Sequence, residues 1–182
     1  MGLVLDASAV MAWFVQRSDP DEAALADEIL SNVEHDEAVV PALWFIEVVN
    51  GLLVAERNRR SGRSEASRFL AELGAMPIAE DRVRPSAIQG EILALARMNG
   101  LTSYDAVYLE LVLRTGRTLA TFDQKLAEKM AKGSGKKLVD AIVNRVEARK
   151  AYGGAASIPA AHKVKRPAPS PTLMLKEGAG SQ

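Results

Sequence analysis

Short apolar runs alternate with longer amphipathic stretches along most of the chain. The short runs predict β-strands at residues 2–5, 38–40, 76–79, 118–122 and 137–139. The longer stretches have apolar positions at helical spacing and predict helices at residues 8–15, 20–33, 42–60, 64–73, 85–98, 104–114 and 124–132. Strands that alternate with helices indicate an α/β fold, with a parallel sheet covered by helices on both faces.

Composition divides the chain of 182 residues into a domain and a tail. With 48% hydrophobic residues, the chain can form one well-packed core, whereas two cores would be cramped. Four of the eight prolines lie at positions 159, 167, 169 and 171, among Gly, Ala, Ser and scattered basic residues. We therefore expect one domain over residues 1–150 and a disordered basic tail over residues 151–182.

The composition also excludes several classes of protein. The absence of cysteine rules out a disulfide scaffold or a thiolate zinc site and suits a reducing compartment. The N-terminus lacks the basic lead and long apolar stretch of a signal peptide. The apolar stretch at residues 38–55 contains Pro41, Glu47 and Asn50, which favours a buried helix over a membrane span. We expect a soluble cytoplasmic protein.

The net charge of zero hides an uneven distribution along the chain. Residues 1–56 carry eleven acids and one base, whereas residues 57–150 carry eighteen bases and eleven acids. Such a separation is typical of a surface that binds a polyanion, although solvated helix faces explain part of it. The basic side chains that we expect beside a nucleic-acid backbone are Arg57, Arg59, Arg60, Arg63, Lys125, Lys129 and Lys132.

Four acidic residues, Asp6, Glu47, Asp105 and Asp123, interrupt or end apolar runs. Acidic side chains are almost never fully buried unless another group compensates their charge. Asp6 and Asp123 precede predicted helices and could cap them, and Asp105 could form a capping box with Thr102. Glu47 is expected in the middle of a helix, where capping does not explain it. Its alternative is a salt bridge to a partly buried arginine.

A divalent cation with oxygen ligands is the common compensator that fits these acids best. The chain has only two histidines, and close carboxylates repel by ~4 kcal/mol per pair at intermediate dielectric unless a cation holds them. Mg²⁺ or Mn²⁺ in such a cluster can activate water and stabilise a phosphoryl transition state. Ser8 and Thr121 could position water or a metal ligand, or serve as a cap and a strand-surface residue. Asn50 could orient Glu47, or be a buried amide bonded to the backbone.

The residues around the four acids resemble the four acidic motifs of PIN-domain ribonucleases, and they are closest to those of the VapC toxins of bacterial toxin–antitoxin pairs. The matching strings are Val4-Leu5-Asp6-Ala7-Ser8, Glu47-Val48-Val49-Asn50, Thr102-Ser103-Tyr104-Asp105-Ala106-Val107-Tyr108 and Leu119-Ala120-Thr121-Phe122-Asp123-Gln124-Lys125-Leu126. Their order and spacing agree with the family over roughly residues 1–140.

This resemblance implies a three-layer α/β/α domain with a central parallel sheet. It implies that Asp6, Glu47, Asp105 and Asp123 are the catalytic, metal-binding acids. It also implies Mg²⁺- or Mn²⁺-dependent cleavage of RNA to 5′-phosphate and 3′-hydroxyl ends, a homodimer, and inhibition by a cognate antitoxin. The extension after Val139 departs from the usual compact toxin, and the resemblance does not explain its role.

Two other functions compete with this one. A phosphatase that works through an aspartyl-phosphate, of the haloacid dehalogenase type, would also use an acid after the first strand. It would need a second acid two residues later, where this chain has Ser8. The other alternative is a non-catalytic module that binds RNA or protein and keeps a structural cation at the acids.

Aromatic residues give two further expectations. We expect Tyr104 and Tyr108 to pack in the core. The apolar region around Trp13, Phe14, Trp44 and Phe45 could receive the antitoxin, with at least two of these residues used for core packing instead.

Overall fold

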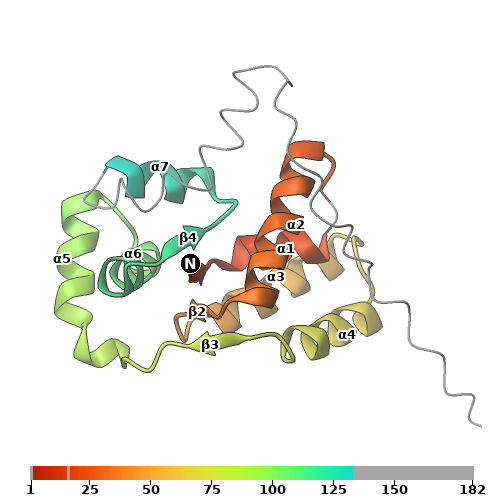
Figure 1. Cartoon of the computed structure of the whole chain (residues 1–182), viewed down its shortest axis with the longest axis horizontal. Coiled ribbons are helices and arrows are strands. Elements are labelled where there is room, and N and C mark those ends of the chain that lie inside the picture. Colours follow the sequence, from red (N-terminus) through yellow and green to blue (C-terminus); the bar gives the residue numbers. More distant parts are fainter. Residues whose placement is uncertain (1, 16, 133–182) are drawn as a thin grey trace, which may run out of the picture.

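The computed structural model describes residues 2–15 and 17–132. Within these residues, four short strands form one sheet in the order β3-β2-β1-β4, with every neighbouring pair parallel (Figure 1). The strands are β1 (Leu3–Leu5), β2 (Ala38–Val40), β3 (Ile78–Glu80) and β4 (Thr118–Ala120). The strand expected at residues 137–139, the end of the domain at residue 150 and the tail at residues 151–182 lie outside the described residues.

Helices cover the sheet from two sides. They are α1 (Ala7–Phe14), α2 (Pro20–His35), α3 (Trp44–Arg57), α4 (Arg63–Leu73), α5 (Gln89–Asn99), α6 (Ser103–Thr115), α7 (Gln124–Lys132) and the short 3₁₀ helix η1 (Pro85–Ala87). Helices α5 to α7 group on one side of the strands and α1 to α4 on the other (Figure 1). The expected α/β/α architecture with a central parallel sheet is therefore confirmed. None of these helices is long and apolar enough to cross a membrane.

Two predicted helices differ from the observed ones. The helix predicted at residues 85–98 is divided into η1 and α5, because the backbone of Ile88 (φ −120°, ψ 12°) leaves the helical region between them. The helix predicted at residues 42–60 is shorter at both ends. It begins only at Trp44, whose N–H bonds the Pro41 carbonyl, and it ends before Arg59, whose positive φ stops the helix. Glu47 consequently lies in the first turn of α3, so its expected mid-helix position is wrong.

Strand β1 lies between β2 and β4 in the sheet. Its pairing with β4 determines which residues meet at the carboxyl ends of the strands. Leu5 of β1 pairs with Ala120 of β4, and both residues are fully buried. The pairing continues one step further, since the Asp6 N–H donates to the Ala120 carbonyl at 3.0 Å. Asp6 and Thr121 are therefore brought side by side, as expected where neighbouring parallel strands end at one edge.

An ionic network fixes the loop after β3 to helix α6. The Arg114 guanidinium contacts Glu110 on its own helix at 2.7 Å and Asp81 in the loop at 2.5 Å. Glu110 is only 7% exposed, so its charge depends on this arginine for compensation.

Replacing Arg114 should destabilise the protein far more than replacing an exposed arginine. The Arg114→Met variant leaves Glu110 buried without a partner, which should lower the free energy of unfolding by about 3–5 kcal/mol. The matched control is Arg68→Met, because Arg68 contacts Glu72 at 3.9 Å with both side chains about two-thirds exposed. That variant should lose less than about 1 kcal/mol. Urea unfolding measures the free energy of unfolding of both variants. Equal losses would contradict the role of Arg114 as the partner that compensates the buried charge of Glu110.

Candidate active site

Asp6 connects β1 to α1 and is buried, with 7% of its surface exposed. Its Oδ2 atom accepts hydrogen bonds from the Ser8 N–H at 3.1 Å, from the Ser8 hydroxyl and from the Thr121 hydroxyl at 2.8 Å. Burial raises the pKa of Asp6; the bonds from Ser8 and Thr121 oppose this rise, and the charge of Asp123 adds to it. No hydrogen bond from a described residue reaches its Oδ1 atom, which leaves that oxygen for another ligand.

The hydroxyls of Ser8 and Thr121 link the ends of β1 and β4. The two oxygen atoms lie 3.2 Å apart. Ser8 Oγ accepts the N–H of Phe122 at 2.8 Å, and Thr121 Oγ1 accepts the N–H of Asp123 at 3.0 Å. Thr121 is 3% exposed, so it is not a strand-surface residue. Both hydroxyls hold the Asp6 carboxylate and the backbone that leads to Asp123.

Glu47 is half-buried in the first turn of α3 and accepts a hydrogen bond at Oε2 from the Tyr108 hydroxyl of α6. Burial raises the pKa of Glu47; the bond from Tyr108 opposes this, and the charges of Asp6 and Asp105 add to the rise. Among the described residues no arginine forms a salt bridge with Glu47, so the expected alternative is wrong.

Asp105 and Asp123 lie at the starts of α6 and α7. The Asp105 N–H donates to Thr102 Oγ1 at 3.1 Å, and its Oδ2 atom lies 3.8 Å from the Lys129 ammonium. Asp123 Oδ1 accepts the N–H groups of Lys125 and Leu126 at 2.9 and 3.1 Å. Asp123 therefore caps α7 as its alternative explanation requires, and its second carboxylate oxygen takes no part in that cap.

Tyr108 of α6 makes a polar contact that the sequence did not predict, whereas Tyr104 of α6 and Asn50 of α3 are exposed, contrary to expectation. Tyr108 is buried as predicted, at 2% exposure, but its hydroxyl also contacts Glu47. Burial raises the pKa of Tyr108, so the phenol stays a hydrogen-bond donor. The signal in the sequence was its spacing, because Tyr108 follows Asp105 by three residues on one helix face.

Tyr104 is 65% exposed, so its expected core position is wrong. Asn50 is exposed and makes no hydrogen bond to Glu47 among the described residues, so it is not a buried amide.

Of the four aromatic residues expected at the apolar surface, Trp44 is buried, Trp13 and Phe14 are half-buried and Phe45 is exposed. Trp44 is 2% exposed and belongs to the core. Trp13 donates its indole N–H to the Ala26 carbonyl at 3.0 Å, and the Phe14 ring packs 4.9 Å from the Phe69 ring. Only Phe45, at 43% exposure, remains as an open apolar side chain of the four.

The negative charges of the four acids affect the pKa values of their neighbours. Asp123 raises the pKa of Asp6, and both Asp6 and Asp105 raise the pKa of Glu47. Within the described ranges, no three acidic or histidine side chains are close enough to hold a metal ion between them in their present positions. The donor set is nonetheless made of carboxylate and hydroxyl oxygens, with partly uncompensated negative charge. That chemistry fits Mg²⁺ or Mn²⁺.

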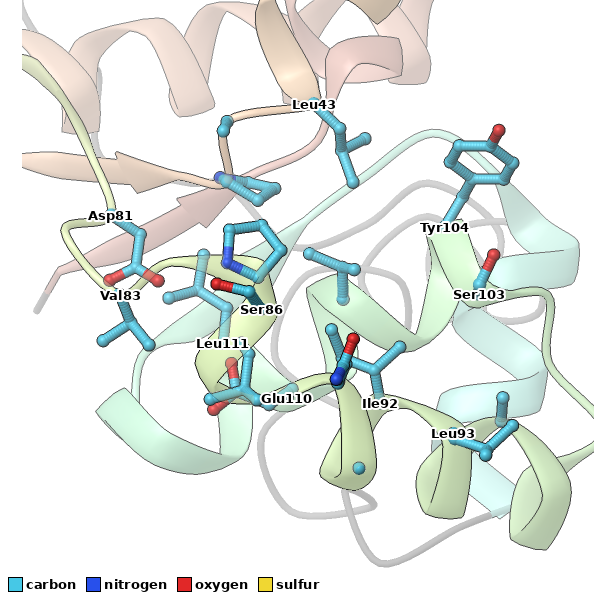
Figure 2. A pocket seen from close by; sticks show the side chains of 18 residues that line it. Leu43, Asp81, Val83, Ser86, Ile92, Leu93, Ser103, Tyr104, Glu110 and Leu111 are labelled. Carbon is cyan, nitrogen blue, oxygen red and sulfur yellow. The ribbon is translucent and has the colours of Figure 1, made fainter.

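A groove of about 920 Å³ lies beside this site, between the loops after β2 and β3 and helices α5 and α6 (Figure 2). Leu43, Val83 and Ile92 contribute to its mostly apolar lining, and Tyr104 lies at the end where α6 begins. None of the four acids lines the groove. It is therefore a separate feature of the surface, next to the acidic site.

Comparison with known proteins gives three similarities. The family model described as PIN domain matches residues 3–132. Ribonuclease VapC3 of Pyrobaculum aerophilum is 34% identical over 131 residues, which cover 71% of this chain and 95% of that protein. The crystal structure of PAE2754 from Pyrobaculum aerophilum has a similar fold, with a TM-score of 0.52 and 24% identity, over 81% of this chain and 96% of that chain.

The burial of Asp6 predicts how metal-free stability depends on pH. Because the folded pKa of Asp6 is raised above 3.8, the folded state holds a proton that the unfolded chain has already lost. The stability of the wild-type protein relative to Asp6→Asn should therefore fall as the pH rises above about 4 and level off beyond the folded pKa. Urea unfolding in the presence of a chelator between pH 4 and 8 measures the difference.

The control for the loss of one negative charge is Asp27→Asn, at an exposed position of α2. A difference between wild type and Asp6→Asn that stays constant over this pH range, or that changes in the opposite direction, would contradict the raised pKa.

Proposed function

The chain belongs to the PIN domain family and is of the VapC type, and from this premise we propose that it is a Mg²⁺- or Mn²⁺-dependent endoribonuclease that acts as a toxin. The observation that carries the proposal is the pair of acids Asp6 and Glu47. Both have raised pKa values, and among the described residues neither has a cationic partner. A cation bound between such acids would favour the charged form of both carboxylates.

In this proposal Asp6, Glu47, Asp105 and Asp123 hold the cation. A bound Mg²⁺ or Mn²⁺ lowers the pKa of water and stabilises negative charge on a phosphate. Ser8 and Thr121 hold one oxygen of Asp6, so that its other oxygen stays directed away from them. The cap that Asp123 forms through Oδ1 likewise leaves its other oxygen available.

Two observations support RNA as the substrate. The similar protein of Pyrobaculum aerophilum is named a ribonuclease. In addition, the Lys129 ammonium lies 3.8 Å from Asp105, and Lys125 lies in the first turn of α7, two residues after Asp123. Ammonium groups beside the acids can bind phosphates without reading the base sequence.

We also propose that a cognate antitoxin silences the enzyme by covering α3. Four apolar side chains on this helix are 43–73% exposed: Phe45, Ile46, Val49 and Leu53. Glu47 lies in the same helix, one residue from Ile46. A protein that covers these side chains would therefore also lie beside Glu47. The homodimer expected from the family stays a prediction.

Substitution of each acid should abolish RNA cleavage while the protein stays folded. We expect Asp6→Asn, Glu47→Gln, Asp105→Asn and Asp123→Asn to lower the cleavage rate at least ~100-fold, the typical cost of losing an electrostatic stabiliser. A chelator should stop wild-type cleavage, and Mg²⁺ or Mn²⁺ should restore it. The rate is measured on total RNA by sequencing the new ends. Full activity in all four variants would refute the proposal, and RNA binding without cleavage by the wild type would favour the non-catalytic module.

Expression of the chain in a bacterium should arrest growth, and an antitoxin should relieve the arrest. The first candidate is the product of a short neighbouring gene with a basic DNA-binding N-terminus. We expect Ile46→Glu to weaken its binding at least tenfold by titration calorimetry, because a charge would be buried in the contact. Leu93→Glu, at a 50% exposed position of α5, is the control and should bind normally. Equal affinity of both variants would exclude α3 as the contact.

A further inference from the structure

We propose that Tyr108 is a positioning residue that fixes the Glu47 carboxylate for the cation, an inference that rests on the proposed function. Its hydroxyl donates a hydrogen bond to Glu47 Oε2. Within the described residues no hydrogen bond reaches Oε1, so one oxygen is held while the other stays available. The bond joins α6 to α3, two helices whose acids belong to the same site.

The tyrosine can hold a flexible partner because its own position is fixed. Tyr108 is 2% exposed and is one of the largest fully buried side chains. Its neighbours on α6, Leu109 and Leu111, are buried in the same core. A glutamate side chain has several rotatable bonds, and fixing them beforehand lowers the entropy cost of binding a ligand.

Helix α6 carries both Tyr108 and Asp105, three residues apart and therefore on one face. The same helix that would supply one metal-binding acid thus also orients a second acid on another helix.

The same arrangement occurs at Asp6. There the hydroxyls of Ser8 and Thr121 hold Oδ2 and leave Oδ1 without a bond from the described residues. Asp6 and Glu47 are thus each held through one oxygen by the hydroxyl groups of other residues. Groups that orient metal ligands in this way typically contribute 10–100-fold to metal affinity.

The test is the affinity of the full chain for Mn²⁺, measured from the electron paramagnetic resonance signal of the free ion. We expect Tyr108→Phe, which removes one oxygen and keeps the ring, to raise the dissociation constant at least ~10-fold. Tyr104→Phe removes the same oxygen one turn earlier on α6, at an exposed position, and should bind like the wild type. In a Glu47→Ala background, Tyr108→Phe should change the affinity less than ~2-fold, because the group that it positions is absent.

Several outcomes would overturn this inference. One is an unchanged Mn²⁺ affinity in Tyr108→Phe, with or without a lower melting temperature, since it would leave only a structural role. Another is an effect of Tyr108→Phe that persists in the Glu47→Ala background. In both cases weaker binding by Glu47→Ala would leave the proposed function standing. Absence of Mn²⁺ binding by the wild type would instead refute both proposals.

A second variant tests the same contact without touching the core. Glu47→Asp shortens the side chain by one methylene and moves the carboxylate out of reach of the Tyr108 hydroxyl. It should raise the dissociation constant for Mn²⁺ at least ~10-fold relative to the wild type, whereas wild-type affinity would overturn the inference. This comparison holds even if Tyr108→Phe fails to fold.

Discussion

The parallel pairing of β1 with β4 is the interaction on which the site depends. It matches Leu5 with Ala120 and continues through the hydrogen bond from the Asp6 N–H to the Ala120 carbonyl. Side chains alternate between the two faces of a strand, so a shift of one residue would turn Thr121 away from Asp6. The contact between their side chains at 2.8 Å would then be lost, and with it the link to Asp123. A few backbone bonds thus determine which side chains meet.

All four acids lie at helix N-termini. A carboxylate can cap a helix through one oxygen and leave the other for a metal ion, so the two roles do not exclude one another. Asp6 and Asp123 accept N–H groups of α1 and α7, and Glu47 and Asp105 lie in the first turns of α3 and α6. A helix N-terminus stabilises a nearby negative charge by about 0.3–1 kcal/mol. The helix N-termini therefore reduce the cost of keeping these carboxylates charged, although the raised pKa values of Asp6 and Glu47 indicate that burial outweighs this help at those two residues.

The order of the helices and strands could be predicted from the sequence, and so could the positions of Asp6 and Thr121 at strand ends. Both depend on local patterns of apolar residues. Asp6 and Thr121 follow short apolar runs, and such runs identify buried parallel strands well. The positions of side chains around a helix were harder to predict. Tyr104 and Tyr108 have the same chemistry, and only the packing of α6 decides that one is exposed and the other contacts Glu47. The prediction that Asn50 contacts Glu47 or is a buried amide was wrong for the same reason. Its spacing from Glu47 suited a contact, but its side chain is exposed to solvent.

The first turn of α3 shows how tightly the proposed functions are combined in a few residues. Successive residues of a helix point about 100° apart, so that four residues cover the whole circumference. Trp44 packs in the core, Phe45 and Ile46 are exposed, and Glu47 meets Tyr108. A one-residue insertion within this turn would rotate the side chains before it by about 100° relative to those after it. The residues of the core, of the proposed partner surface and of the site would then no longer face their present neighbours. The fold can therefore tolerate changes of residue type on the exposed face of this turn but not a change in its length.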